Sequence, residues 1–335
     1  MADAHLPAYR LAGFEVDALF DLNQARAEEV AARFGVKRVC LSLEEAIRTA
    51  PARAVFDLAV PPSVNLEILE QLPDGAPVLI QKPLGENLEQ ARALVALCRR
   101  KHLKAAVNFQ LRYAPYILAA RHLIEQGTIG EVHDMEVRLT IYMPWHLWTF
   151  LEGIPRVEIL YHSVHYLDLI RSFLGEPAGI WAQTIKHPKT QKLASTRTSM
   201  ILNYGDVLRA TINVNHGHEF GPAHQESYVK WEGTRGAIKA RIGLLLNLSN
   251  YPKGEPDKLE YCALEEGKAP EWIEVPVEGS WFPHAFMGTM SSVMRFADGE
   301  IPDLPTSVED AFKTMALVEA AHASSASGGT SLPPL

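Results

Sequence analysis

The sequence predicts an α/β protein in two parts: a doubly wound parallel sheet, then an α+β domain with a large open, mainly antiparallel sheet. In residues 1–113, short apolar segments alternate with helical segments at the spacing of parallel βαβ units. In residues 114–335, long stretches alternate apolar and polar residues, which is typical of antiparallel strands with one covered face. A chain of 335 residues that is 47% hydrophobic is long enough for two domains.

The first part reads as strand and helix in turn. Residues 14–20 form an apolar segment that ends at Asp21, and residues 23–34 follow with helical spacing up to Gly35. The remaining predicted elements are a Ser-capped helix over 42–49, a strand over 54–60, a helix over 64–72, a strand over 78–80, a helix over 88–102 and a strand over 105–109.

The pattern changes after Pro115, with a helix over 116–126. Strands are then predicted over residues 133–142, 179–186, 198–204, 207–215, 228–231 and 237–242. Helices are predicted over residues 159–174, 285–297 and 307–325. An open sheet of this kind predicts that its uncovered face packs against another subunit, in a homodimer or homotetramer.

Composition argues against several classes of protein. The formal charge is −8 without a long run of Lys or Arg, which argues against nucleic-acid binding. The three cysteines Cys40, Cys98 and Cys262 are odd in number and widely spaced, so they predict no disulfide framework and suit a reducing cytoplasm. No apolar run approaches the ~18 residues of a membrane span.

Lys82 is the leading candidate for a working residue. It follows the apolar strand 78–80, and Pro83 restricts it to extended backbone while ending the strand. Ligands of open α/β sheets bind just beyond such strand ends. The alternative is an exposed lysine that merely ends a strand.

The start of the chain departs from a dinucleotide-binding pattern. The sequence contains no Gly-x-Gly, and residues 1–9 look like the interior of the helix that follows such a turn. Asp21 nevertheless stands where an acidic residue meets the ribose hydroxyls. Two interpretations remain: the strand and turn precede Met1, or the domain has lost dinucleotide binding.

Several motifs together resemble the Gfo/Idh/MocA family of NAD(P)-dependent oxidoreductases. They are Gln81-Lys82-Pro83, the turn with Pro61 and Pro62, the segment from Asn108 to Pro115, and His165-x-x-Asp168. The resemblance implies that Lys82 contacts the reacting hydroxyl, that His165 is catalytic, and that Asp21, Pro61, Pro62, Gln81, Lys82 and Asn108 bind the cofactor. Gln81 replaces the family glutamate, Tyr161 the aspartate, Ser163 the glycine and Asn65 a frequent histidine.

On the predicted helix 159–174, Tyr161, His165 and Asp168 are spaced i, i+4 and i+7 and are expected on one stripe. His165 is the expected proton acceptor, because an imidazole titrates near neutral pH. Tyr161 is expected either to relay a proton or to hold the substrate. Asp168 contacts substrate, orients His165 or belongs to a structural network.

Further residues are candidates for substrate binding. Arg112 anchors a sugar hydroxyl or carboxylate, or forms a structural salt bridge. Trp145 and His284 lie in aromatic segments that suit sugar rings, or equally an interface or core. His162 is a candidate substrate ligand. With His165 it has helical spacing for a metal, and His216, His218 or His224 could join the pair, but no fixed carboxylate or cysteine accompanies them, so no metal is predicted.

The predicted reaction is the reversible oxidation of a secondary hydroxyl of a sugar, sugar acid or polyol, with NAD taking the hydride. Asp21 favours NAD because a carboxylate repels a 2′-phosphate, although NADP stays possible. Two alternatives are a non-catalytic ligand sensor on the same fold, and a lyase or hydrolase that oxidises its substrate transiently with tightly bound NAD.

Overall fold

The computed structural model describes residues 1–243 and 256–331, which form two compact units. Unit 1 comprises Met1–Tyr113 with Phe282–Phe312, and unit 2 comprises Ala114–Trp281 with the residues from Lys313 onwards. The structure differs from the predicted division at residues 282–312, because the helix α8 (Ala285–Ala297) joins the core of unit 1. Among the described residues, we find no helix both long and apolar enough to cross a bilayer.

Unit 1 contains parallel strands, as the sequence predicts. β1 (Ala18–Leu19) pairs with β2 (Arg38–Val39), and a second sheet has the order β3 (Phe56–Leu58), β4 (Pro77–Ile80), β5 (Lys104–Val107). Both sheets are parallel throughout, as in a doubly wound fold. Within the described residues, β1 and β3 are not paired with each other.

Three helices of unit 1, α2 (Gln24–Phe34), α3 (Leu43–Thr49) and α5 (Leu88–Arg100), begin where their sequences provide a cap. In each case the side chain of the capping residue, Asn23, Ser42 or Asn87, accepts a hydrogen bond from the backbone N–H three residues later. This bond satisfies an N–H group that has no partner within the first turn of the helix. The other helices are α1 (His5–Ala12), α4 (Asn65–Gln71) and α8.

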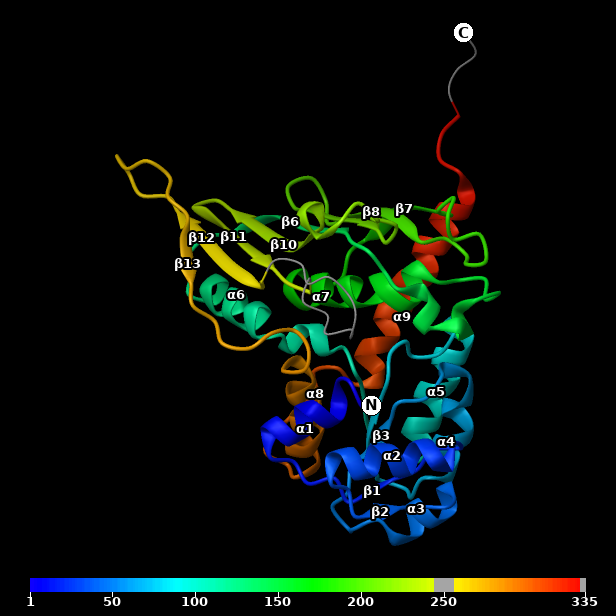
Figure 1. Cartoon of the computed structure of the whole chain (residues 1–335). Coiled ribbons are helices and arrows are strands. Elements are labelled where there is room, and N and C mark those ends of the chain that lie inside the picture. Colours follow the sequence, from blue (N-terminus) through cyan, green and yellow to red (C-terminus); the bar gives the residue numbers. More distant parts are fainter. Residues whose placement is uncertain (244–255, 332–335) are drawn as a thin grey trace. The chain divides into compact units, whose positions relative to one another are not determined.

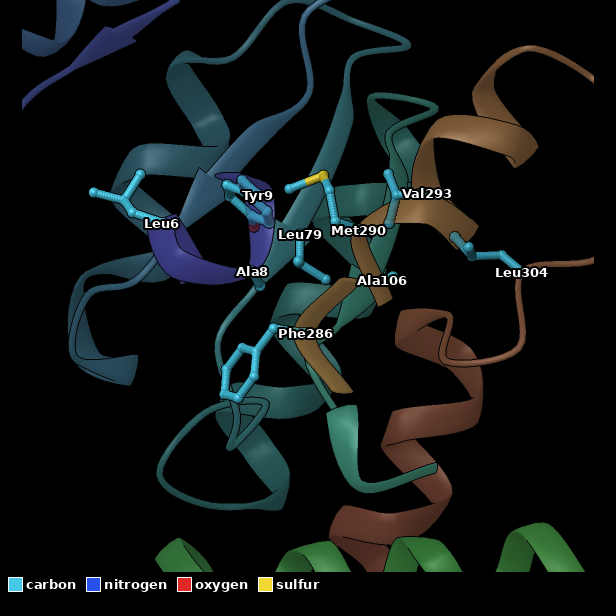
Figure 2. Packing of buried hydrophobic residues seen from close by; sticks show 9 residues of the cluster. All are labelled: Leu6, Ala8, Tyr9, Leu79, Ala106, Phe286, Met290, Val293 and Leu304. Atoms are coloured by element: carbon cyan, nitrogen blue, oxygen red, sulfur yellow. The ribbon is translucent and has the colours of Figure 1, made fainter. Parts of the chain in front are cut away.

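The core of unit 1 joins segments far apart in the sequence. Figure 2 shows Leu79 of β4 and Ala106 of β5 together with side chains of α1 and α8. On α8, Phe286, Met290 and Val293 are buried, and their spacing of four and three residues places them on one helix face. That apolar face, rather than chain proximity, assigns α8 to unit 1.

Unit 2 is built on a mixed sheet of eight strands within the described residues, in the order β13-β12-β11-β10-β6-β9-β8-β7. Only the pair β6–β9 is parallel, so the sheet is mainly antiparallel, as predicted. The strands are β6 (Val132–Thr140), β7 (Gly179–Ile185), β8 (Arg197–Asn203), β9 (Arg209–Asn215), β10 (Glu226–Gly233), β11 (Gly236–Arg241), β12 (Lys258–Ala263) and β13 (Ile273–Val275).

Helices cover one face of this sheet. Figure 1 shows α6 (Pro115–Glu125) and α7 (Val164–Leu174) on that face. The end of α9 (Val308–Ser327) protects the edge strand β7, since Ser324 and Ser325 accept N–H bonds from Ala182 and Thr184. On the opposite face, Trp181, Ile185 and Ile201 are about half exposed, and Trp181 is paired directly with Ile201; we call these three residues the β7–β8 face.

Candidate functional site

Lys82 follows the carboxyl end of β4. The neighbouring strands hold this end in place, because Gln81 N–H donates to Leu58 O (3.0 Å) and Asn108 N–H donates to Ile80 O (2.8 Å). Pro83 and Leu84 after it are buried, while Lys82 itself is half-buried. Burial lowers the pKa of Lys82 from 10.5 to about 8. A pKa of about 8 keeps most of the amine protonated at pH 7 while easing its loss of a proton, which suits a group that acts on a reacting oxygen.

A buried polar cluster lies behind the lysine. His5 Nδ1 is 2.7 Å from Asp57 Oδ2, and the Tyr9 hydroxyl donates to the same oxygen at 2.6 Å. Burial alone would raise the pKa of Asp57, but His5 and Tyr9 outweigh it and hold this pKa below its usual value. Burial and the neighbouring Asp57 raise the pKa of Tyr9, so the phenol stays neutral.

Two amide side chains connect this cluster with the ends of β4 and β5. Gln81 Nε2 is 3.3 Å and Asn108 Nδ2 is 3.4 Å from His5 Nε2. Gln81 Oε1 accepts the backbone N–H of Lys82 at 2.9 Å, and the Thr289 hydroxyl of α8 donates to Asn108 Oδ1 at 2.8 Å. A continuous chain of hydrogen bonds therefore runs from Asp57 to the backbone of Lys82.

The predicted cofactor residues all follow carboxyl ends of strands in unit 1. Asp21 follows β1, is exposed, and accepts the N–H of Asn23 through Oδ1 (2.8 Å), so its second oxygen can meet a hydroxyl. Pro61 and Pro62 follow β3 and lead into α4, where Asn65 is fully buried and neither of its amide atoms bonds a described residue. The start of α1 has no side-chain cap. A carboxylate, an available amide and an uncapped helix start fit a dinucleotide.

His165 and Tyr161 lie in unit 2. His165 is buried at the first turn of α7, with its ring edge-on to Trp281 at 6.1 Å between centroids. Tyr161 lies in a π-helical turn, Ile159–Ser163, in which Val164 N–H bonds Ile159 O five residues back. The prediction of a single α-helix over 159–174 is thus wrong in its first turn. Because the π-helical turn holds one extra residue, α-helical spacing no longer places Tyr161 on the same helix face as Asp168. Such turns are frequent at functional sites.

Asp168 and Arg112 have protein partners. Asp168 is buried, accepts from the Thr314 hydroxyl at 3.1 Å, and lies 3.9 Å from Arg171 Nη1. Arg112 donates to Asp310 Oδ2 at 2.6 Å and to Pro305 O at 2.9 Å. These contacts agree with the structural alternative for each residue, a salt bridge for Arg112 and a buried network for Asp168. The roles of both residues in substrate binding stay predictions.

A second buried cluster was not predicted. Ser163, at the position of the family glycine, donates to Glu158 Oε1 at 2.7 Å and closes the π-helical turn; His216 Nε2 is 3.5 Å from the same oxygen. The His162 ring is 4.4 Å from that of His216, and Trp145 lies edge-on to both at 5.6 Å. In the part of the chain that the structure describes, no three metal-ligand side chains converge.

Other predicted residues differ in their surroundings. His284 is half-buried just before α8, so it belongs to unit 1, whereas Trp145 and His162 belong to unit 2. The residues missed from the sequence are His5, Tyr9 and Asp57 in unit 1 and Glu158 in unit 2. Asp57 did offer a signal, because it is an acidic residue inside the apolar segment 54–60.

Two family models match the chain. Residues 1–109 match the model described as "Oxidoreductase family, NAD-binding Rossmann fold". Residues 117–239 match the model described as "GFO/IDH/MocA C-terminal domain". The two matches meet near the first boundary between the units.

Individual relatives agree with these matches. D-apiose dehydrogenase of Rhizobium rhizogenes is 24% identical over 95% of this chain and 90% of its own length. An oxidoreductase of Agrobacterium radiobacter, solved with NAD+, L-tartaric acid and magnesium, superposes with a TM-score of 0.78 at 21% identity and covers 97% of this chain and 93% of that one. A levoglucosan dehydrogenase solved with NADH and levoglucosan gives 0.76 at 16% identity, covering 97% and 94%. At these identities the solved structures show the shared fold.

Proposed function

Because the chain belongs to the Gfo/Idh/MocA family of oxidoreductases, whose amino-terminal domain binds NAD, we propose that it reversibly oxidises a secondary hydroxyl of a sugar, sugar acid or polyol. The names of relatives, D-apiose dehydrogenase and levoglucosan dehydrogenase, support this substrate class. The observation that carries the proposal is Lys82, held at the end of β4 with its pKa lowered to about 8.

Each catalytic candidate has a distinct task in this proposal. Protonated Lys82 hydrogen-bonds the substrate oxygen and stabilises the negative charge that develops on it. His165 accepts the hydroxyl proton, and Tyr161 holds the substrate or passes on that proton. Arg112, Trp145, His162, Asp168 and His284 stay candidates for substrate contacts.

The cofactor residues of unit 1 suit NAD. Asp21 would hold the adenosine ribose hydroxyls and would repel a 2′-phosphate, which favours NAD over NADP. The neighbouring strand ends carry Pro61, Pro62, Gln81 and Asn108. No side chain caps the start of α1, so its first backbone N–H groups have no side-chain acceptor. Bound NAD supplies the hydride acceptor.

We further propose that the β7–β8 face packs against a second copy of the chain, giving a homodimer or homotetramer. Trp181 is 59% exposed, Ile185 45% and Ile201 48%. Apolar side chains this large, on a sheet face without a covering helix in the described residues, favour burial between subunits.

The test is reduction of NAD+ by a panel of sugars, sugar acids and polyols, followed by the absorbance of reduced nicotinamide. It is run on this chain and on a form that carries any in-frame residues encoded upstream. We expect stoichiometric cofactor reduction that is at least about a hundredfold slower in Lys82→Met. Bound NAD released on denaturation, without net reduction in turnover, would favour the lyase or hydrolase alternative. Failure of both forms to bind any dinucleotide would favour the sensor and would contradict the proposal.

A further inference from the structure

Gln81 connects the lysine with the buried His5–Asp57 pair. Its carbonyl oxygen accepts the backbone N–H of Lys82, and its amide nitrogen faces His5 Nε2. His5 is 2% exposed and lies 52 residues from Asp57 in the sequence, so α1 and β3 bring the pair together. Gln81 thus contacts both the His5 ring and the Lys82 backbone.

The hydrogen bonds fix where the proton of His5 lies. A backbone N–H can only donate, so Gln81 Oε1 must face Lys82 and Gln81 Nε2 must face His5. The Thr289 hydroxyl bonds Asn108 Oδ1, which turns Asn108 Nδ2 to His5 as well. Two amide donors therefore face His5 Nε2, which must be unprotonated, and the proton lies on Nδ1 and is donated to Asp57.

We propose that Gln81 is a positioning residue for Lys82, and that an uncharged amide is needed at this position because His5 presents a lone pair to it. A carboxylate in place of the amide has no proton to offer His5 Nε2. It would draw a second proton onto the ring and place a negative charge beside the lysine backbone. This inference rests on the proposed role of Lys82 in the reaction.

Within residues 1–243 and 256–331, Asp57 is the charged side chain that contacts the His5 ring directly. Asp57 comes from β3 and Tyr9 from α1 itself, while Gln81 and Asn108 follow β4 and β5 and the Phe286 ring of α8 lies at 4.9 Å. The Met1 amine interacts with Asp57 from further along the chain start. Asp57 already receives the Nδ1 proton, so protonation of Nε2 requires both amides to turn away.

The first test reads the histidine ring directly, by nitrogen NMR of the full chain at pH values around 7. We expect His5 to be the neutral tautomer protonated at Nδ1 in the wild type, and a doubly protonated imidazolium in Gln81→Glu. The matched control is Gln126→Glu, since Gln126 Nε2 lies 2.9 Å from His122 Nε2 in an exposed pair where water can replace the amide. An unchanged His5 ring in Gln81→Glu would overturn the inference.

The second test follows Lys82 itself, by carbon NMR of its Cε and by the pH profile of turnover. In Gln81→Glu we expect the Lys82 titration to move up by a fraction of a pH unit. One carboxylate oxygen faces the Lys82 backbone, and the imidazolium of His5 beyond the other oxygen offsets the new charge only in part. Gln81→Met removes both bonds without adding charge, and should lower kcat while leaving substrate KM nearly constant. Wild-type kcat and pH profile in Gln81→Met, or an unchanged Lys82 titration in Gln81→Glu, would overturn the inference. The NMR readouts need no turnover, so an inactive wild type would refute the proposed function and leave the Gln81 result standing.

Discussion

Replacing Lys82 by Met should slow turnover by about a hundredfold to a thousandfold and yet stabilise the protein at neutral pH. Burial lowers the pKa of Lys82 from 10.5 to about 8, so the folded protein holds an ammonium group at pH 7 in a site that disfavours it. The full shift corresponds to about 3 kcal/mol at 1.36 kcal/mol per unit. Because Lys82 stays partly accessible to solvent, we expect a gain of about 1–3 kcal/mol.

The sign of this effect depends on pH. Between pH 8 and 10.5 the unfolded chain binds the lysine proton and the folded chain does not, so wild-type stability rises with pH in that window. Met has no proton to release. The advantage of Lys82→Met over the wild type is therefore largest below pH 8 and shrinks as the pH rises towards 10.5.

Denaturant titration of both proteins at pH 7 and pH 9.5 measures this difference. The control is Lys37→Met, which removes an exposed lysine of unit 1 and should leave stability within about 0.5 kcal/mol at both pH values. Turnover of Lys82→Met should fall by about a hundredfold to a thousandfold, as for the loss of one donor to a developing oxyanion. The reasoning would be refuted if Lys82→Met were less stable than the wild type at pH 7, or if the stability difference between the two proteins were the same at pH 7 and pH 9.5.

Three further changes test other parts of the molecule. Asp21→Ala should weaken NAD binding by about 1.5–3 kcal/mol, because the hydrogen bonds from the ribose hydroxyls to the carboxylate are lost, and should narrow the preference for NAD over NADP. Binding curves for the two cofactors that are equal both before and after the change would contradict the role of Asp21 at the ribose. Ser163→Ala leaves the buried Glu158 carboxylate without its hydroxyl donor and should cost about 1–3 kcal/mol in denaturant unfolding, whereas Ser199→Ala on the exposed side of β8 should cost little. Trp181→Glu should convert the oligomer to a smaller species in light scattering, and a wild-type chain that is already monomeric would disprove the proposed subunit contact.

Regular elements were predictable because their signals are local. Asn23, Ser42 and Gly35 mark helix ends that the structure places within one residue of the prediction. The strand 78–80 was recognisable from three apolar residues before Gln81, and β8 and β9 from their alternation. The strands β2, β12 and β13 were missed, since two or three residues, or a strand with charged residues on one face, give little periodicity.

Contacts between distant segments were not predictable in the same way. The periodicity of α8 shows that one face is buried, but only the structure shows that this face meets β4 and β5. In the sequence of α1, nothing distinguishes His5 from an ordinary polar helix residue until the structure places Asp57 beside it. Glu158 looks like a surface charge in the sequence, but the structure buries it beside the π-helical turn. A π-helical turn differs from an α-helical turn by one extra residue, and the sequence periodicity over a single turn is too short to show that difference.

The pH dependence of NAD+ reduction, with the sugar or polyol that reacts best, tests the central claim most directly. If Lys82 stabilises charge on the reacting oxygen, the wild-type rate should titrate near pH 8, and this titration should be absent from the residual rate of Lys82→Met. A wild-type rate without any transition near pH 8, or the same profile in both proteins, would contradict the account.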